Sequence, residues 1–256
     1  MVKKIIYAIL AIGVIFILTS FFLDVYFYSP TKVIKDVFKG RDLSQEELFK
    51  EGRLFRLKLT YMGFLPVGEA EIRVGALEVL GNGQAYKLTA IARTSGLISR
   101  IYQATAKVTS YMDKTKLHSL KYLEEIETKD EIKTKEIIFD QVNHVATRKD
   151  RQYKILPDTQ DGLSSFFSML SRDFKVGGSF SSFLITKEAN YEFQTKVLDK
   201  KDDVWKVAVS VGRQDKSSSH GGSFIFNVLD GKCKIPLSIK GWTQAGLVTA
   251  RLIEVN

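Results

Sequence analysis

The stretch LFRLKLTY at residues 54–61 alternates large apolar and polar side chains from Phe55 onward. Successive side chains of a β-strand point to opposite faces, so this period of two predicts a strand with one buried face and one solvated face. Such a strand is typical of an antiparallel sheet, because parallel strands are usually apolar on both faces. The polar positions hold Arg56, Lys58 and Thr60, and the apolar positions hold Phe55, Leu57, Leu59 and Tyr61.

The same alternation recurs along most of the chain that follows. Turn-forming residues separate the runs, as at Gly81-Asn82-Gly83 and Asp230-Gly231. A twisted sheet with this many strands should curl strongly or partly close on itself. The sequence therefore predicts a mainly β fold, a strongly curved antiparallel sheet or half-open barrel of about eleven strands. The further runs cover residues 68–74, 85–93, 104–112, 116–127, 131–139, 182–198, 204–212, 222–230, 233–242 and 247–255.

One segment interrupts the strand pattern. DGLSSFFSMLSRDF at residues 161–174 predicts a helix that Asp161 or Ser164 can cap, and TSGLISRIY at residues 94–102 predicts a turn or a short helical detour. A lone helix between two groups of strands is expected to pack across the concave face of the sheet. Its apolar face would hold Phe166, Phe167, Met169 and Leu170.

Residues 5–23, IIYAILAIGVIFILTSFFL, contain no charged side chain. A helix of this length reaches about 28 Å, close to the thickness of the hydrocarbon core of a bilayer. A cleaved signal peptide is the alternative, but its apolar region is shorter and ends at a small-residue cleavage site. The sequence therefore predicts a membrane anchor within residues 1–30, in contact with the lipid bilayer through residues 5–23.

The lysines at positions 3 and 4 favour a cytoplasmic N-terminus. Four basic residues between positions 32 and 41 outnumber these lysines, so a strict count of Lys and Arg favours the reverse orientation. Long domains, however, translocate largely regardless of charge. We expect a single-pass protein of the bacterial inner membrane whose C-terminal domain is periplasmic. Residues 31–52 predict a helical spacer, and residues 53–256 predict a single curved antiparallel β domain.

The chain carries a net charge of +9, but its lysines are dispersed rather than clustered around stacking aromatic residues. We therefore expect no nucleic acid as a partner, and weak attraction to anionic membrane surfaces fits the charge better. The single cysteine, Cys233, excludes an internal disulfide and a cysteine-cluster metal site. Its position in an alternating run predicts a buried small side chain.

The motifs of common enzymes are missing from the sequence. His118, His144 and His220 lie on different runs and lack the spacing of paired metal ligands. HGGS at residues 220–223 is similar to the oxyanion loop of a lipase, but the chain has no G-x-S-x-G elbow. We expect no catalytic residue, metal site or cofactor, and a hydrolase is the weaker alternative.

Several large aromatic residues lie near predicted turns, strand ends or the inserted helix. Packing in the core is the ordinary role of such residues, and lining an apolar pocket between sheet and helix is the alternative. The candidates for lining are Tyr61, Phe64, Tyr102, Phe166, Phe167, Trp205 and Trp242.

Four stretches occur in the order found in one bacterial family. They are YMGFLPVGEAEIRV, TSGLISRIYQATAKVTSYMD, DGLSSFFSMLSRDFKVG and LDGKCKIPLSIKGWTQAGLVTARL. Over roughly residues 50–256 the chain thereby resembles the exported family called domain of unknown function 3108. The resemblance implies an exported or membrane-anchored protein of the Gram-negative envelope with a curved sheet, similar in shape to LolA- and LolB-type lipoprotein carriers. It implies no catalytic residues, and the long anchor departs from the family pattern.

Two functions remain open from the sequence. The first is a non-enzymatic envelope protein that binds a lipid or other apolar ligand in the concavity of its sheet. The second is a structural or partner-binding module of an envelope assembly, whose partner would be another envelope protein. An open apolar inner surface would favour the first function, and a filled interior would favour the second.

Overall fold

The computed structural model describes residues 47–256, except for residues 82, 187–188, 214–219 and 244–245. The predicted transmembrane span at residues 5–23 and most of the predicted spacer lie outside the described residues. In the part of the chain that is described, neither helix combines the length and the apolar character needed to cross a bilayer.

The strands of the described chain belong to one antiparallel sheet of fourteen strands. Across the sheet, the strands run in chain order from β8 to β1, and β14 to β9 continue on the other side of β1. This curved, mainly β architecture confirms the predicted class. The strands are β1 (Leu54–Tyr61), β2 (Leu65–Leu80), β3 (Gly83–Thr94), β4 (Ala104–Asp113), β5 (Ser119–Thr128), β6 (Ile132–Asp140), β7 (Val145–Arg148), β8 (Arg151–Lys154), β9 (Ser179–Thr186), β10 (Ala189–Lys201), β11 (Val204–Arg213), β12 (His220–Leu229), β13 (Ile235–Thr243) and β14 (Gly246–Val255).

The predicted count of about eleven strands was wrong for two reasons. β7 and β8 span only four residues each, which is too short for an alternating pattern to stand out. In addition, the run at residues 182–198 is divided between β9 and β10, which meet at two residues that are neither Gly nor Pro. The sequence carries no turn signal at that point, so its pattern predicts one strand where the structure has two.

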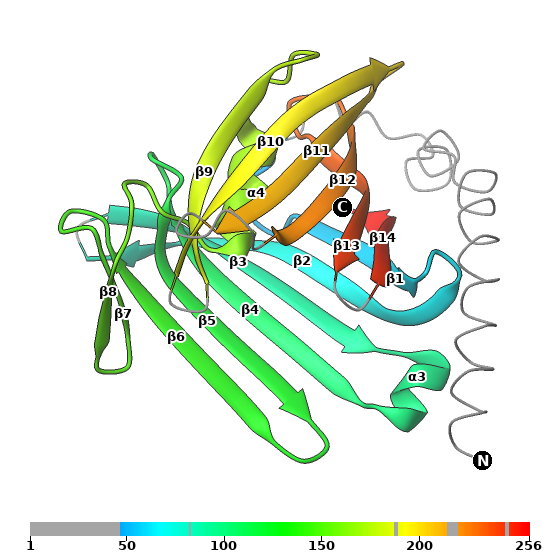
Figure 1. Ribbon diagram of the computed structural model, residues 1–256, viewed down its shortest axis with the longest axis horizontal. Coiled ribbons are helices and arrows are strands. Elements are labelled where there is room, and N and C mark those ends of the chain that lie inside the picture. The colour runs from blue at the N-terminus through cyan, green and yellow to red at the C-terminus, as the bar shows by residue number, and fades with distance from the viewer. Residues whose placement is uncertain (1–46, 82, 187–188, 214–219, 244–245) are drawn as a thin grey trace.

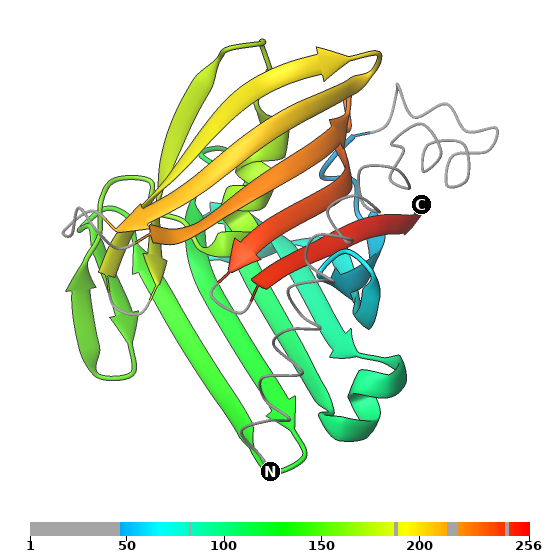
Figure 2. The same ribbon diagram turned by 45° about the vertical axis from the view of Figure 1, so that its right-hand side comes forward.

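The sheet bends so that its two halves face each other across a helix. In Figures 1 and 2, β1 to β6 form one half, β9 to β14 form the other, and α4 lies between them. Gln160 forms a parallel bridge to Leu184 of β9, and the Ser119 amide at the start of β5 donates to the Thr159 carbonyl at 3.4 Å. The segment that holds Thr159 and Gln160 thus joins the two halves opposite the β1–β14 seam, as expected for a partly closed barrel.

The predicted helix is present as α4 (Gly162–Ser171), and a shorter helix, α3 (Gly96–Ile101), connects β3 to β4. The Asp161 carboxylate accepts hydrogen bonds from the amides of Leu163 and Ser164, and the Ser164 hydroxyl accepts one from the Asp161 amide. Both predicted capping residues therefore act together in a capping box, which satisfies amides that a helix start leaves without partners.

The main core surrounds α4. Residues 163–170 of this helix are all buried, and the Phe166 and Phe167 rings lie 5.9 and 5.7 Å from the rings of Phe226 and Phe49. Of the predicted inward positions of the first strand, Phe55 and Leu57 are almost inaccessible to solvent in this core. The register shifts between Leu59 and Thr60, so Leu59 is only partly buried and Thr60 is buried instead. Cys233 is buried in the same core, as its sequence context predicted.

A second, smaller cluster packs the β7–β8 hairpin against β9. It consists of five buried residues, and the Asn190 side-chain amide adds a hydrogen bond of 3.0 Å to the Lys154 carbonyl. The short strands at one edge are thereby tied to the strands at the other edge. The cluster contains Ile137, Phe139, Ala146, Ile155 and Ile185.

Candidate apolar ligand site

The inner face of β2, β3 and β4 changes in character along the strands. Close to α4 its positions hold the large side chains of Val74, Leu88 and Met112, each fully buried. Farther along the same strands the inner positions hold alanines that are only partly buried. We call these residues the alanine patch; they are Ala70, Ala90, Ala92, Ala104 and Ala106.

Strand register brings the alanine patch together. Ala70 lies opposite Ala92, Ala92 lies opposite Ala106, and Ala106 lies opposite Ile126 of β5. Directly opposed residues on one face of an antiparallel pair have Cβ atoms about 4.5–5.5 Å apart, so these side chains form one continuous row. The row is apolar, lies on the concave side of the sheet and retains access to solvent.

The other half of the sheet also presents partly buried apolar side chains on its inner face. They include Phe224 of β12, whose ring lies 6.4 Å from that of Phe226. A Cβ atom at Gly241 would come within 2.8 Å of the Phe224 ring, so the glycine on β13 allows this ring to lie flat against the neighbouring strand. A chain of rings therefore leads from Phe166 on α4 across Phe226 to Phe224.

A polar cluster borders the alanine patch on β5 and β6. The Tyr122 hydroxyl donates to the Glu124 carboxylate at 2.5 Å, and the Lys135 ammonium lies 5.4 Å from the centre of the Tyr122 ring. Burial, the hydrogen bond to Glu124, and the negative charges of Glu124 and Asp161 all raise the pKa of the Tyr122 hydroxyl. Tyr122 therefore stays protonated and can act as a hydrogen-bond donor across the physiological pH range.

A buried carboxylate fixes α4 to the sheet. One oxygen of Asp161 accepts from the hydroxyls of Ser110 and Ser119, at 2.6 and 2.7 Å, and the other accepts from the first-turn amides of the helix. These four hydrogen bonds satisfy both oxygens of the buried carboxyl group. The sequence predicted the cap but not the two serine hydroxyls, which come from other strands.

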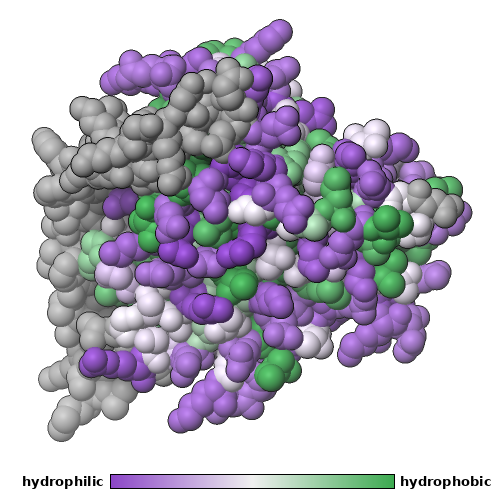
Figure 3. All heavy atoms as spheres, turned by 180° about the vertical axis from the view of Figure 1, so that it is seen from behind, coloured by the Kyte–Doolittle hydropathy of each residue, from purple (hydrophilic) through white to green (hydrophobic). Residues whose placement is uncertain are grey.

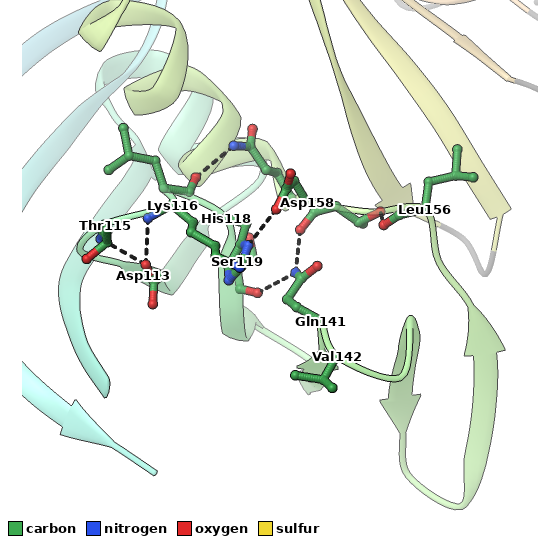
Figure 4. Close-up of polar contacts among 12 residues, drawn as sticks. Asp113, Thr115, Lys116, His118, Ser119, Gln141, Val142, Leu156 and Asp158 are labelled. Carbon is green, nitrogen blue, oxygen red and sulfur yellow. Dashed lines mark hydrogen bonds and ion pairs between the residues drawn. The ribbon is translucent and has the colours of Figure 1, made fainter. Parts of the chain in front are cut away.

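Figure 4 shows further polar contacts, around His118, Ser119 and Gln141. His118 Nδ1 lies 2.9 Å from Asp158 Oδ1, and the Gln141 side-chain amide donates to the carbonyls of Ser119 and Thr159 at 2.7 and 2.8 Å. The Gln160 side-chain amide donates to the Leu117 carbonyl. These contacts hold the segment at residues 158–160, which joins the two halves of the sheet, against the connection between β4 and β5.

The serines, histidine and aspartates of this region do not assemble a nucleophile and a base. The Ser119 hydroxyl is engaged by Asp161 and Ser164, whereas His118 is engaged by Asp158. Among the described residues, no group of three metal-ligating side chains is close enough to hold an ion. The arrangement binds two parts of the backbone together and supports a structural role.

The aromatic residues named as candidates from the sequence are spread over several elements of the fold and do not gather in one site. Phe166 and Phe167 are buried on α4 with their rings 5.6 Å apart, and Trp205 is buried against Phe174. Tyr61 ends β1, next to the turn that holds Phe64, and Tyr102 follows α3. Phe64, Tyr102 and Trp242 are exposed by 41, 58 and 46%. Of the seven, Phe166 is part of the chain of rings that leads to Phe224 on the inner face.

The sequence analysis did not predict the alanine patch, because a small side chain such as alanine gives little indication of a ligand site. The pairs Ala90 and Ala92, and Ala104 and Ala106, stand two positions apart on successive runs, which is the only trace they leave in the sequence. Figure 3 shows one side of the molecule, on which hydrophilic side chains predominate and hydrophobic ones form small separate groups.

The fold and the site define an all-β, barrel-like protein with a helix buried between the halves of its sheet and an apolar inner face. The chain belongs to the family described as protein of unknown function (DUF3108), whose model matches residues 56–252. This match confirms the resemblance inferred from the four stretches.

A solved structure shares the architecture at low sequence identity. A beta-barrel-like protein of domain of unknown function DUF1849 from Brucella abortus is 11% identical with a TM-score of 0.59, and the match covers 82% of this chain and 98% of that chain. This likeness shows the fold alone. A candidate lipoprotein from Parabacteroides distasonis is 8% identical over 84% of this chain and 100% of that chain, with a TM-score of 0.27, too low to support a shared fold. Comparison with curated proteins gives no significant match.

Proposed function

We propose that this protein is a non-enzymatic, membrane-anchored component of the Gram-negative envelope that binds the acyl part of a lipid, or another apolar ligand, on the alanine patch. The observation that carries the proposal is an apolar surface that lies inside the fold and is still partly open to solvent. A sheet interior that served stability alone would be filled by larger side chains, as it is around α4.

The alanine patch suits a long, apolar ligand. Its small side chains leave space above a continuous row that crosses three strands. Covering such a surface with an acyl chain removes apolar area from water on both sides, at roughly 25 cal/mol per Å². Tyr122, Glu124 and Lys135 would then stand beside the polar end of the ligand, and a few polar groups at the edge of an apolar site are typical of ligand pockets.

The location of the protein rests on the sequence. The uncharged stretch at residues 5–23 would tether the domain to the inner membrane, and the lysines before it favour a periplasmic domain. Acyl chains are abundant at that surface. A tethered domain with an apolar inner face would encounter them without having to cross the periplasm.

The proposal can be tested in living cells with the full-length protein. A photo-crosslinking amino acid placed at Ala92 or Ala106 should give lipid adducts that mass spectrometry identifies. Arg93 and Lys107 provide matched controls, because each follows a patch residue on the same strand and points to the opposite, exposed face. Adducts at the two inner positions only would support binding on the patch. Equal lipid labelling at all four positions, or none at the inner ones, would refute it.

The filled core around α4 favours a second candidate function, a structural or partner-binding module. Phe167 and Leu170 are almost inaccessible to solvent between the helix and the sheet. In that case the exposed basic side chains of the outer face would meet another envelope protein. The same experiment separates the two functions, because protein adducts at Arg93 and Lys107 without lipid at the inner positions would favour the module.

A further inference from the structure

A groove of about 880 Å³ crosses the outer face of β9 to β13. The outward direction follows from alternation with the core. Gln194, which lines the groove, lies between the buried residues Phe193 and Thr195, and Ser210 follows the buried Val209. The groove therefore lies on the opposite side of the sheet from the alanine patch, and it is independent of the function proposed above.

Short side chains form the floor of this groove. Ser210 of β11 lies opposite Ser223 of β12, and Ala208 lies beside them on β11. The groove reaches from β9 to β13, which is about 19 Å at the usual spacing of neighbouring strands. The floor is low because these three side chains are short: alanine ends at Cβ, and serine ends at Oγ.

The two walls of the groove differ in chemistry. Trp242 lies opposite Ser223 and forms an apolar wall together with Ile225. On the other side, β10 contributes a polar wall of Glu192, Gln194 and Lys196. Its one acidic and one basic side chain cancel, so the groove has no net charge that would select a polyanion.

Trp242 is unusually open for a tryptophan. Its exposed fraction is 46%, whereas the chain's other tryptophan, Trp205, is buried. An indole carries a broad apolar face and a polar N–H at its edge, a combination that recurs at binding surfaces. In the described part of the chain the side chains of Gln194, Ser210 and Ser223 form no hydrogen bonds with protein groups, so they can serve a ligand.

We propose that this groove binds a glycan, a chain of pyranose sugars. A pyranose ring has an apolar C–H face and a rim of hydroxyl groups, which matches an indole wall beside hydroxyl, amide and carboxylate groups. Trp242 stacks against a sugar ring, while Gln194, Ser210 and Ser223 bond to its hydroxyls. An acyl chain would leave these polar groups without partners, which is unfavourable once water is displaced.

The test uses the full-length protein in lipid nanodiscs and isothermal titration with two soluble probes, N-acetylchitotetraose and cellotetraose. We expect a dissociation constant at or below about 1 mM for at least one probe, and a loss of about tenfold or more in Trp242→Ala. Ala208→Phe, which fills the floor, should also abolish binding. Preference between the probes separates an N-acetylated amino-sugar chain, as in cell-wall polymers, from a plain glucan.

The control variant is Lys206→Ala, an exposed change on β11 that lies outside the groove and should keep full affinity. The proposal is overturned if neither tetrasaccharide binds at millimolar concentrations. It is equally overturned if sugar binding persists in both Trp242→Ala and Ala208→Phe. A third contradicting outcome is that the protein is a dimer that binds no sugar and that Trp242→Ala dissociates it.

Discussion

Asp230, in the connection between β12 and β13, combines a hydrogen bond with an ion pair. Its carboxylate lies 2.6 Å from the Lys200 ammonium, which in turn lies 4.7 Å from the centre of the Trp205 ring. Partial burial raises the pKa of the Asp230 carboxyl, but hydrogen bonds and the charge of Lys200 outweigh this effect and lower it. The ionised carboxylate is therefore favoured in the folded protein.

This shift predicts a pH-dependent effect of Asp230→Asn. A carboxyl whose pKa is lower in the folded state stabilises the protein above its unfolded pKa of about 3.9, and the contribution is lost as the pH falls through the folded value. The substitution should lower the free energy of unfolding by at most about 1 kcal/mol at neutral pH, because the pair is partly exposed. The difference should shrink as the pH falls below about 4.

Urea unfolding followed by circular dichroism at a series of pH values measures this difference. Asp150→Asn, at an exposed position between β7 and β8, provides the control and should show little change. A deficit in Asp230→Asn that stays constant down to pH values well below 4 would contradict the assigned ion pair.

At the scale of the element, α4 depends on the buried carboxylate at its start. Asp161 is 3% exposed and accepts four hydrogen bonds, two from its own helix and two from the hydroxyls of Ser110 and Ser119. Asp161→Ala removes the cap and leaves both hydroxyls buried without this acceptor. We expect a loss of about 3 kcal/mol in unfolding free energy, the sum of a helix cap and an unsatisfied buried group.

Asp173→Ala provides the comparison, since Asp173 follows the same helix and is exposed. Both variants can be measured by urea unfolding of the full-length protein in nanodiscs. Equal stability of the two variants would mean that the network around Asp161 contributes little to holding α4 in the sheet.

At the scale of the whole molecule, the two edges of the sheet are joined unequally. The main core surrounds α4, whereas the β7–β8 hairpin is tied to β9 by the five residues of the smaller cluster. Regions with few buried contacts open locally before the molecule unfolds as a whole. We therefore expect amides of β7 and β8 to exchange with deuterium faster than those of β1 and β14.

Ile185→Ala sharpens this expectation, because Ile185 of β9 belongs to the smaller cluster and the substitution removes its side chain from that cluster. Hydrogen exchange measured by mass spectrometry should show faster exchange in β7 and β8 in the variant. Exchange in β1 and β14 should stay the same. An equal increase in all strands would show that the hairpin unfolds only together with the main core.

The sequence by itself determined the local features of this protein. The alternation in residues 54–61 predicted a strand with an inward face, and Phe55 and Leu57 are buried there. The Asp161 and Ser164 cap and the helix that follows were also predicted, because capping involves residues three apart. The four family stretches were recognisable for the same reason, since each is a continuous run of sequence.

Only the tertiary structure decided what lies across strands. The row formed by Ala70, Ala92 and Ala106 depends on the register of three strands, which a one-residue slip would change entirely. Likewise, Ser110 and Asp161 are 51 positions apart in the chain and share a hydrogen bond of 2.6 Å. The sequence around an alanine or a serine does not indicate which residue of a distant segment will lie beside it. The candidate site therefore comes from the pairing of distant segments, whereas the class of fold comes from side-chain alternation within each segment.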